Sequence, residues 1–174
     1  YLYIYADGRY GTFSTNRLEE KELEDFIVKA IEMVRMLGED SCRRLPDPER
    51  TAKDAITGRE LGLFDEKYYN MEADERLSNA LKLSKYDTVK KTEEGFTLIS
   101  EECEYSCTAD DNYVTDSNGF EGRHSETTFG TFSEMTIEDP QGNKYSGYWW
   151  QTCSKADETD YGIGDKALQR AISQ

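Results

Sequence analysis

The chain has 174 residues, enough for one ordinary domain or two small ones. Its 36 acidic side chains outnumber its 21 basic ones, and the formal net charge of −15 argues against direct binding to the nucleic-acid backbone. No apolar run approaches the roughly 20 residues that a membrane-spanning helix needs, so no membrane span is expected. Because the first residue is Tyr1 and not Met, we expect a fragment of a longer protein.

The first part of the chain, residues 1–45, predicts a β-hairpin followed by an amphipathic helix. Aliphatic and tyrosine side chains alternate up to an Asp7-Gly8 pair, which suits the positive φ angles of a type I′ turn. A helix is predicted over about 19–37, because one apolar stripe recurs there with the period of 3.6 residues. The stripe consists of Leu23, Phe26, Ile27, Ala30, Ile31, Val34 and Leu37. Residues 46–71 keep no period and predict an irregular crossover.

The remaining segment, residues 72–174, predicts a helix, an antiparallel meander and the start of a further helix. The first of these helices is expected over about 72–85, with Asn70 as its N-cap. Its predicted inner face consists of Ala73, Leu77, Ala80, Leu81 and Ser84. From Phe96 onward the period changes to two, which is typical of an antiparallel sheet with one face in water. The predicted apolar face there consists of Ile99, Cys103, Tyr105 and Cys107, and Glu101 breaks this pattern.

A long β-hairpin is predicted over residues 113–153. The chain should reverse at Asn118-Gly119 and turn again over 139–142, and a last helix should open near Ile163. Together these elements predict an α+β fold, with antiparallel sheets and amphipathic helices packed on one face in two layers.

Residues with catalytic chemistry are scarce in this sequence. His124 is the only histidine, so neither a multi-histidine zinc site nor an ordinary catalytic triad can be assembled from the segment. Cys103 and Cys107 would lie roughly 13 Å apart on one strand, too far for a disulfide within that strand. The acidic residues at 110–119 lack the spacing of an EF-hand loop and suit turns instead. We therefore predict no catalytic, cofactor-binding or metal-ligating residue in this segment.

An aromatic strand offers the clearest functional hint from the residues themselves. Tyr148, Trp149 and Trp150 follow one another, so the two tryptophans must point to opposite faces of a sheet. One of them then lies away from the face that packs the helices. Because Tyr and Trp are enriched at interaction surfaces, these three residues are the predicted interface.

Five stretches, in this order and spacing, make the sequence resemble the N-terminal half of the TldD/PmbA family, whose members are labelled modulators of DNA gyrase. They are DGRYGTFSTN at 7–16, LPDPE at 45–49, DSNGFEG at 116–122, GYWW at 147–150 and IGDKA at 163–167. The resemblance is greater to the PmbA side, also called TldE, than to the TldD side. Asp116 departs from the family, which tends to have Asn at that place.

The resemblance implies a cytoplasmic metallopeptidase of two subunits that acts on peptides. One subunit, of the TldD kind, carries a zinc-binding His-Glu-x-x-x-His motif in a later part of its chain, and the PmbA kind lacks it. We therefore expect this chain to be the N-terminal part of a non-catalytic PmbA-like subunit that forms a cavity or dimer interface. Its implied partners are a second TldD/PmbA-type subunit, in a homo- or heterodimer, and a peptide substrate, with zinc expected only in the parent complex.

Two alternatives remain open at this point. The chain could be the N-terminal part of the zinc-bearing TldD-type subunit. It could instead be a non-proteolytic interaction module that modulates a gyrase or toxin–antitoxin partner.

Overall fold

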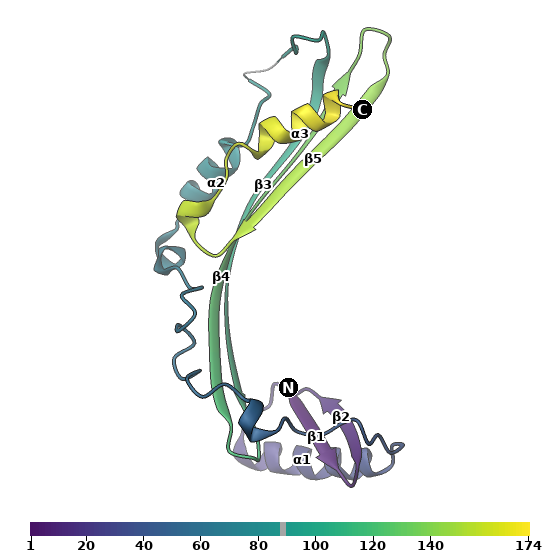
Figure 1. Cartoon of the computed structure of the whole chain (residues 1–174), viewed down its shortest axis with the longest axis vertical. Helices are drawn as coiled ribbons and strands as arrows, with labels where there is room; N and C mark the ends of the chain where they lie inside the picture. The colour runs from purple at the N-terminus through teal and green to yellow at the C-terminus, as the bar shows by residue number, and fades with distance from the viewer. Residues whose placement is uncertain (88–89) are drawn as a thin grey trace. The chain divides into compact units, whose positions relative to one another are not determined.

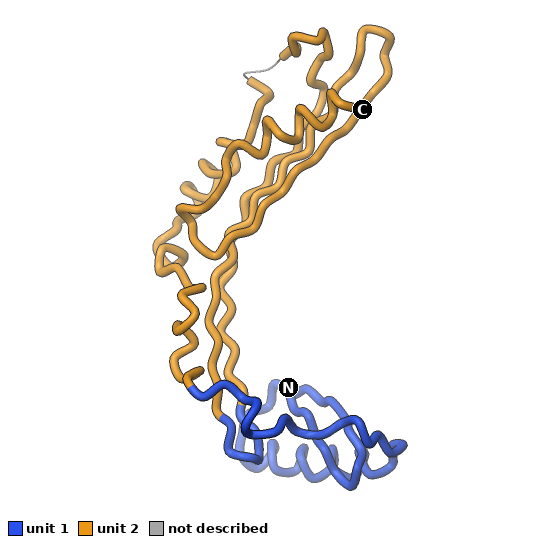
Figure 2. The backbone as a smooth tube through the Cα atoms, viewed as in Figure 1, with its two compact units in different colours: residues 1–53, 115–120 blue, residues 54–114, 121–174 orange. Residues whose placement is uncertain are grey.

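The computed structural model describes residues 1–87 and 90–174 (Figure 1). The chain divides into two compact units: residues 1–53 with 115–120, and residues 54–114 with 121–174 (Figure 2). None of the described helices combines the length and the apolar character that crossing a bilayer requires.

The first unit contains a hairpin and one helix. Strands β1 (Leu2–Ala6) and β2 (Arg9–Phe13) pair antiparallel, and Asp7 and Gly8 between them have φ angles of 52° and 69°. Both angles are positive, so the predicted type I′ turn is confirmed. Helix α1 (Glu20–Arg35) confirms the predicted amphipathic helix with slightly shorter ends.

The hairpin and the helix of this unit are joined through the apolar stripe of α1. Ala30 and Val34 are fully buried, whereas Leu37, at the end of the stripe, lies beyond the helix and is exposed. A Cβ added to Gly11 of β2 would lie 2.8 Å from the Val34 side chain. The small residue therefore lets the hairpin approach the helix closely.

The second unit is built on a three-stranded sheet in the order β3-β4-β5 (Figure 1). The strands are β3 (Thr97–Thr115), β4 (Glu121–Glu138) and β5 (Lys144–Cys153). The predicted turns are confirmed: Gly119 and Gly142 have φ angles of 87° and 85°. The long hairpin and the α+β class are thereby confirmed as well.

One face of this sheet carries the core. Alternate side chains of β4 are buried there, including Phe129, Met135 and Ile137, and helix α3 (Ile163–Ile172) packs on Met135 and Ile137. Burial of such side chains is worth roughly 1.5–3 kcal/mol each. The predicted arrangement of a helical layer on one sheet face is confirmed, and α3 begins at the predicted Ile163.

Helix α2 (Ala73–Leu81) corrects two predictions. Its N-cap is Glu72, and Asn70 is instead the last residue of the preceding 3₁₀ turn. Leu77 and Leu81, predicted to face inward, are 61% and 64% exposed, while Asn79 is 4% exposed. The prediction failed because the buried Asn79 amide oxygen accepts a hydrogen bond from the Lys82 ammonium, which allows a polar residue on the inner face.

The start of β3 also departs from the predicted alternation. Leu98 is buried, the next two residues are exposed, and alternation resumes at Glu101, so Ile99 does not belong to the inner face as predicted. Glu101 turns inward because its carboxylate accepts hydrogen bonds from the Ser84 hydroxyl and from the Lys85 and Tyr86 backbone N–H groups. The residue that broke the sequence pattern therefore anchors the chain that follows α2.

The crossover segment protects an edge of the sheet. β5 pairs with β4 only from Phe129 onward, and before that point residues 55–63 run beside β4 (Figure 1). The backbone N–H groups of Arg123, Ser125 and Thr127 donate to carbonyls of this segment over 2.7, 2.8 and 3.1 Å. Unpaired strand edges invite aggregation, so the segment completes the sheet although it has no strand period of its own.

An ion pair between β3 and β4 makes the stability of this unit depend on pH. The Asp111 carboxylate accepts from Arg123 Nε over 2.8 Å and from the Ser125 hydroxyl over 3.0 Å. The hydrogen bond from Arg123 is the main reason that the pKa of Asp111 is lowered to about 2. Because the folded pKa lies below the unfolded one, this stabilisation is present at neutral pH and is lost as the pH falls from about 4 towards 2.

We expect Asp111→Asn to remove that dependence. The difference in free energy of unfolding between the wild type and the variant should be largest near neutral pH and shrink below about pH 4. Denaturant titrations at several pH values, followed by circular dichroism, measure it. Asp110→Asn, at the exposed neighbouring position, is the control. A difference that stays constant down to pH 2 would contradict the assignment.

Candidate functional site

The aromatic strand β5 displays its side chains on both faces of the sheet. Trp149 pairs with Ser133, which is fully buried on the helix face, whereas Trp150 pairs with Phe132 on the opposite face. Tyr148, Trp149 and Trp150 are nevertheless 49%, 41% and 60% exposed. The expectation that the two tryptophans point to opposite faces is confirmed, and their role as an interface remains a prediction.

These aromatic side chains are organised by contacts within the unit. The rings of Phe132 and Tyr148 are stacked with centroids 6.3 Å apart. The Arg170 guanidinium, from α3, lies 5.3 Å from the Tyr148 ring centroid and 5.9 Å from that of Trp149. Such cation–π contacts restrain side chains that would otherwise move freely in water. Phe132, Tyr148 and Trp150 share the sheet face opposite the helices, and we call these three residues the aromatic patch.

A pocket of about 500 Å³ lies in the second unit, where sequence reasoning placed no site. It is formed by the 3₁₀ turn at Glu66–Asn70, α2, β3 and the loop between β5 and α3. Its volume falls within the usual range for small-molecule sites. The side chains that matter most are those of Lys67, Glu75, Asn79, Lys82, Tyr105 and Tyr161.

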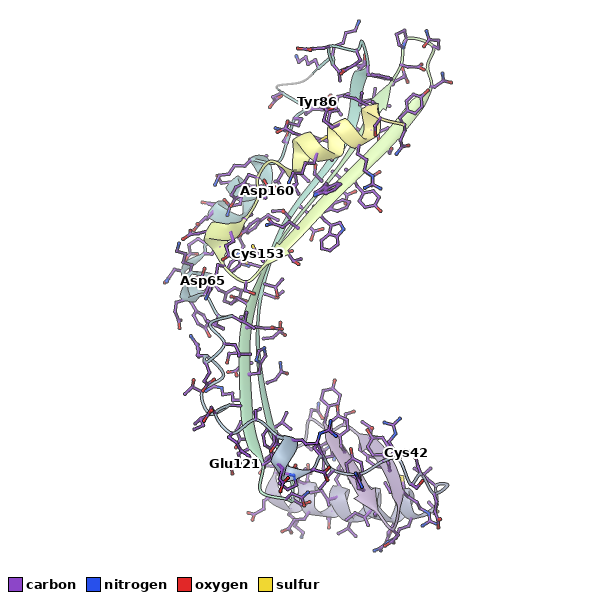
Figure 3. All side chains as sticks on the ribbon, in the orientation of Figure 1. Cys42, Asp65, Tyr86, Glu121, Cys153 and Asp160 are labelled. Atoms are coloured by element: carbon purple, nitrogen blue, oxygen red, sulfur yellow. The ribbon has the colours of Figure 1, made fainter. Side chains whose placement is uncertain are left out.

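The loop between β5 and α3, which forms one wall of the pocket, is held in place by hydrogen bonds at both of its ends. The Asp65 carboxylate accepts from the backbone N–H of Ala156 over 2.9 Å, and Lys155 Nζ donates to the Phe64 carbonyl over 2.6 Å. At the other end of the loop, the Asp160 N–H donates to the Gln151 side chain over 2.7 Å. Figure 3 labels Asp65 and Asp160 at the two ends of this region. The wall is therefore held to both the crossover segment and β5.

Burial shapes the chemistry inside the pocket. It raises the pKa of Tyr105 to about 12 and also raises the pKa of Tyr161, so both hydroxyls stay protonated and can donate hydrogen bonds. The negative charge of Glu75 adds to the effect on Tyr161. Lys67 Nζ lies 2.5 Å from both carboxylate oxygens of Asp157, so these two charges neutralise each other.

The residues considered for metal chemistry do not come together. Across residues 1–87 and 90–174, no three His, Cys, Asp or Glu side chains are placed to hold one metal ion. His124 Nε2 lies 3.2 Å from a Glu126 carboxylate oxygen, and both side chains are partly exposed. These residues do not fit a zinc site. All four cysteines are free thiols, and burial raises the pKa of Cys103.

Comparison with known proteins identifies the family. The model for the PmbA/TldA metallopeptidase central domain matches residues 66–174. The chain belongs to the PmbA/TldD family. The matched region contains the pocket and the aromatic patch, and the recognition made from the five sequence stretches is confirmed.

Two solved structures resemble the chain. A protein from Bacteroides thetaiotaomicron, described as a "putative modulator of DNA gyrase", is 34% identical, with a TM-score of 0.82. The match covers 98% of this chain and 38% of that protein. A protein from Thermotoga maritima with a similar description is 17% identical, with a TM-score of 0.69 over 98% of this chain and 36% of its own, and supports the fold alone. No curated protein sequence matches.

The sequence analysis did not predict the pocket, although the spacing of three polar residues was a signal for it. Glu75, Asn79 and Lys82 have i, i+4, i+7 spacing, which places them on one face of α2. The sequence analysis instead predicted that the apolar residues Leu77 and Leu81 lie on the inner face of this helix. Only the position of Tyr105 and of the loop around Tyr161 shows that these three polar residues line a pocket.

Proposed function

We propose that this chain forms the N-terminal part of a PmbA-like, non-catalytic subunit of a TldD/PmbA-type peptidase. The observation that carries the proposal is the aromatic patch, which lies in the matched family domain and leaves large aromatic side chains in water. Aromatic residues of this kind are enriched at the centres of protein interfaces. In this proposal the patch contributes to a dimer surface or to the wall of a substrate cavity.

The proposal extends to the setting in which the subunit works. Its partner is a TldD/PmbA-type subunit, identical or different, and the complex acts on a peptide in the cytoplasm. The described residues do not fit a zinc site, so a catalytic zinc ion would be held by residues outside this chain. This segment would then supply shape and contacts, not the groups that cleave a bond.

Association of the full-length protein tests the interface. We expect the double substitution Tyr148→Ala and Trp150→Ala to raise the dissociation constant of the dimer at least about tenfold, because truncating two central aromatic residues typically costs 2 kcal/mol or more. Sedimentation velocity over a concentration series measures this constant. Tyr113→Ala removes an equally exposed tyrosine from β3 and is the control. Unchanged association in the double variant would refute the interface.

Proteolysis is tested separately. Peptide cleavage by the full-length protein together with its partner subunit should be lost on chelation and restored by zinc. A His-Glu-x-x-x-His motif in the rest of this polypeptide would contradict the assignment to the PmbA side. Absence of any chelator-sensitive cleavage by the complex would contradict the peptidase role and favour a non-proteolytic interaction module.

A further inference from the structure

The pocket in the second unit is lined by a polar stripe of one helix. Glu75 and Asn79 belong to α2, and Lys82 is its C-terminal cap. Lys82 lies seven positions after Glu75, which corresponds to a backbone rise of about 10.5 Å along a helix at 1.5 Å per residue. The carboxylate of Glu75 therefore stands at one end of this wall, and the ammonium group of Lys82 reaches back from the other end to the Asn79 amide.

The ammonium group of Lys82 is held in position. Its Nζ donates to Asn79 Oδ1 over 2.7 Å and lies 4.7 Å from the ring centroid of Tyr161. Asn79 is itself buried, so it forms a fixed anchor. These contacts orient the charge without neutralising it, because neither partner is an anion.

The two charges of this wall form no close ion pair among the described residues, although Glu75 contributes, after the larger effect of Asp157, to raising the pKa of Lys67. Within the described part of the chain, no ion pair joins Glu75 or Lys82 to another side chain. The other two charged groups that line the pocket, Lys67 and Asp157, pair with each other. A ligand would therefore meet one unpaired carboxylate and one unpaired ammonium group.

Part of the inner surface of the pocket is apolar. Met71 is buried, and the Tyr105 hydroxyl donates to the Met71 sulfur over 3.4 Å, so this part of the pocket presents a thioether and an aromatic ring. Both groups suit an apolar or aromatic side chain of a ligand.

We propose that this pocket binds a zwitterionic dipeptide, with its ammonium group at Glu75 and its carboxylate at Lys82. The Lys82 ammonium is held at Asn79, which follows Glu75 by four positions or about 6 Å of helical rise, and two extended residues span up to about 7 Å, so a dipeptide matches this distance. An apolar side chain of the peptide lies against Met71 and Tyr105. The proposal stands on the pocket geometry and does not require that the aromatic patch forms an interface.

Four forms of one dipeptide test the two ends independently. Alanyl-phenylalanine is titrated calorimetrically into the full-length protein in its free form, N-acetylated, C-amidated, and blocked at both ends. We expect the free dipeptide to bind and each single block to weaken binding about tenfold or more, since each block removes a charged hydrogen bond. Equal binding of all four forms, or no saturable binding of any of them up to millimolar concentrations, overturns the proposal.

Two variants assign each end to its residue. In Glu75→Gln, N-acetylation should no longer weaken binding while amidation still does, and in Lys82→Gln the pattern should be reversed. Asp74→Asn on α2 and Lys144→Gln on β5, which do not line the pocket, should keep the wild-type pattern. Thermal unfolding of each variant shows whether the fold is retained. Folded Glu75→Gln and Lys82→Gln variants that keep the wild-type pattern refute the assignment.

Discussion

Substituting Gly147 with alanine is expected to destabilise the second unit by about 3 kcal/mol, at the upper end of the range for overpacked sites. A Cβ at this position would lie 2.3 Å from the Ala171 backbone nitrogen and 2.5 Å from the Ala167 carbonyl oxygen. Both atoms belong to the backbone of α3 and cannot move aside as the end of a side chain could. The helix would have to withdraw from β5, which would loosen the core it shares with Met135 and Ile137.

Hydrogen exchange in the full-length protein measures this effect locally, because peptides that span β5 and α3 report the free energy of opening of this layer. Gly142→Ala is the control. Its Cβ would meet no atom within 4 Å, but its φ of 85° disfavours a side chain, so we expect a cost of about 1–2 kcal/mol. If Gly147→Ala costs no more than Gly142→Ala, the close approach of strand and helix does not limit stability.

The sheet could be predicted from the sequence because its signals are local. The Asp7-Gly8 and Asn118-Gly119 pairs place the reversals of the chain, and the period of two gives the strands between them. Segments without a hydrophobic period gave little information about their structure. Residues 55–63 follow β4 through backbone hydrogen bonds, and these leave almost no trace in side-chain composition.

The predictions that failed depend on contacts between distant residues. Asn79 faces inward in α2 because Lys82 and the neighbouring elements surround it, whereas hydrophobic periodicity alone favours Leu77 and Leu81. Glu101 turns inward because the backbone after α2 supplies donors that no strand pattern reveals. Such tertiary contacts override local preference, and they are also what creates the pocket.

The two candidate sites also differ in whether local sequence signals or contacts between distant residues define them. Adjacent tryptophans must occupy opposite sheet faces, so once a strand is recognised, Trp149 and Trp150 alone predict that one of the two lies away from the helices. The pocket requires α2, β3 and the loop after β5 to meet, and Tyr105 and Tyr161 are far apart in the sequence. Family membership rests on neither feature but on the match to residues 66–174.

Phe129→Ala is expected to lower the stability of the second unit by about 3–5 kcal/mol, the usual cost of removing a buried aromatic side chain. Phe129 is 1% exposed, and it is the largest fully buried side chain among the described residues. Phe129 also pairs with Cys153, which is where the pairing of β4 with β5 begins. Two residues earlier, Thr127 makes the last of the hydrogen bonds between β4 and the crossover segment that are described above. The cavity would therefore weaken the junction of the sheet as well as its core.

The comparison that isolates the cavity is Phe129→Leu, which keeps most of the apolar volume and should cost clearly less than the alanine variant. Tyr113→Ala, at an exposed site on the neighbouring β3, should change the free energy by no more than about 0.5 kcal/mol. Urea titration of the full-length proteins, combined with hydrogen exchange of peptides from β4 and β5, measures all three. Equal losses for Phe129→Ala and Tyr113→Ala would show that the Phe129 side chain does not stabilise the layer between β4 and the helices.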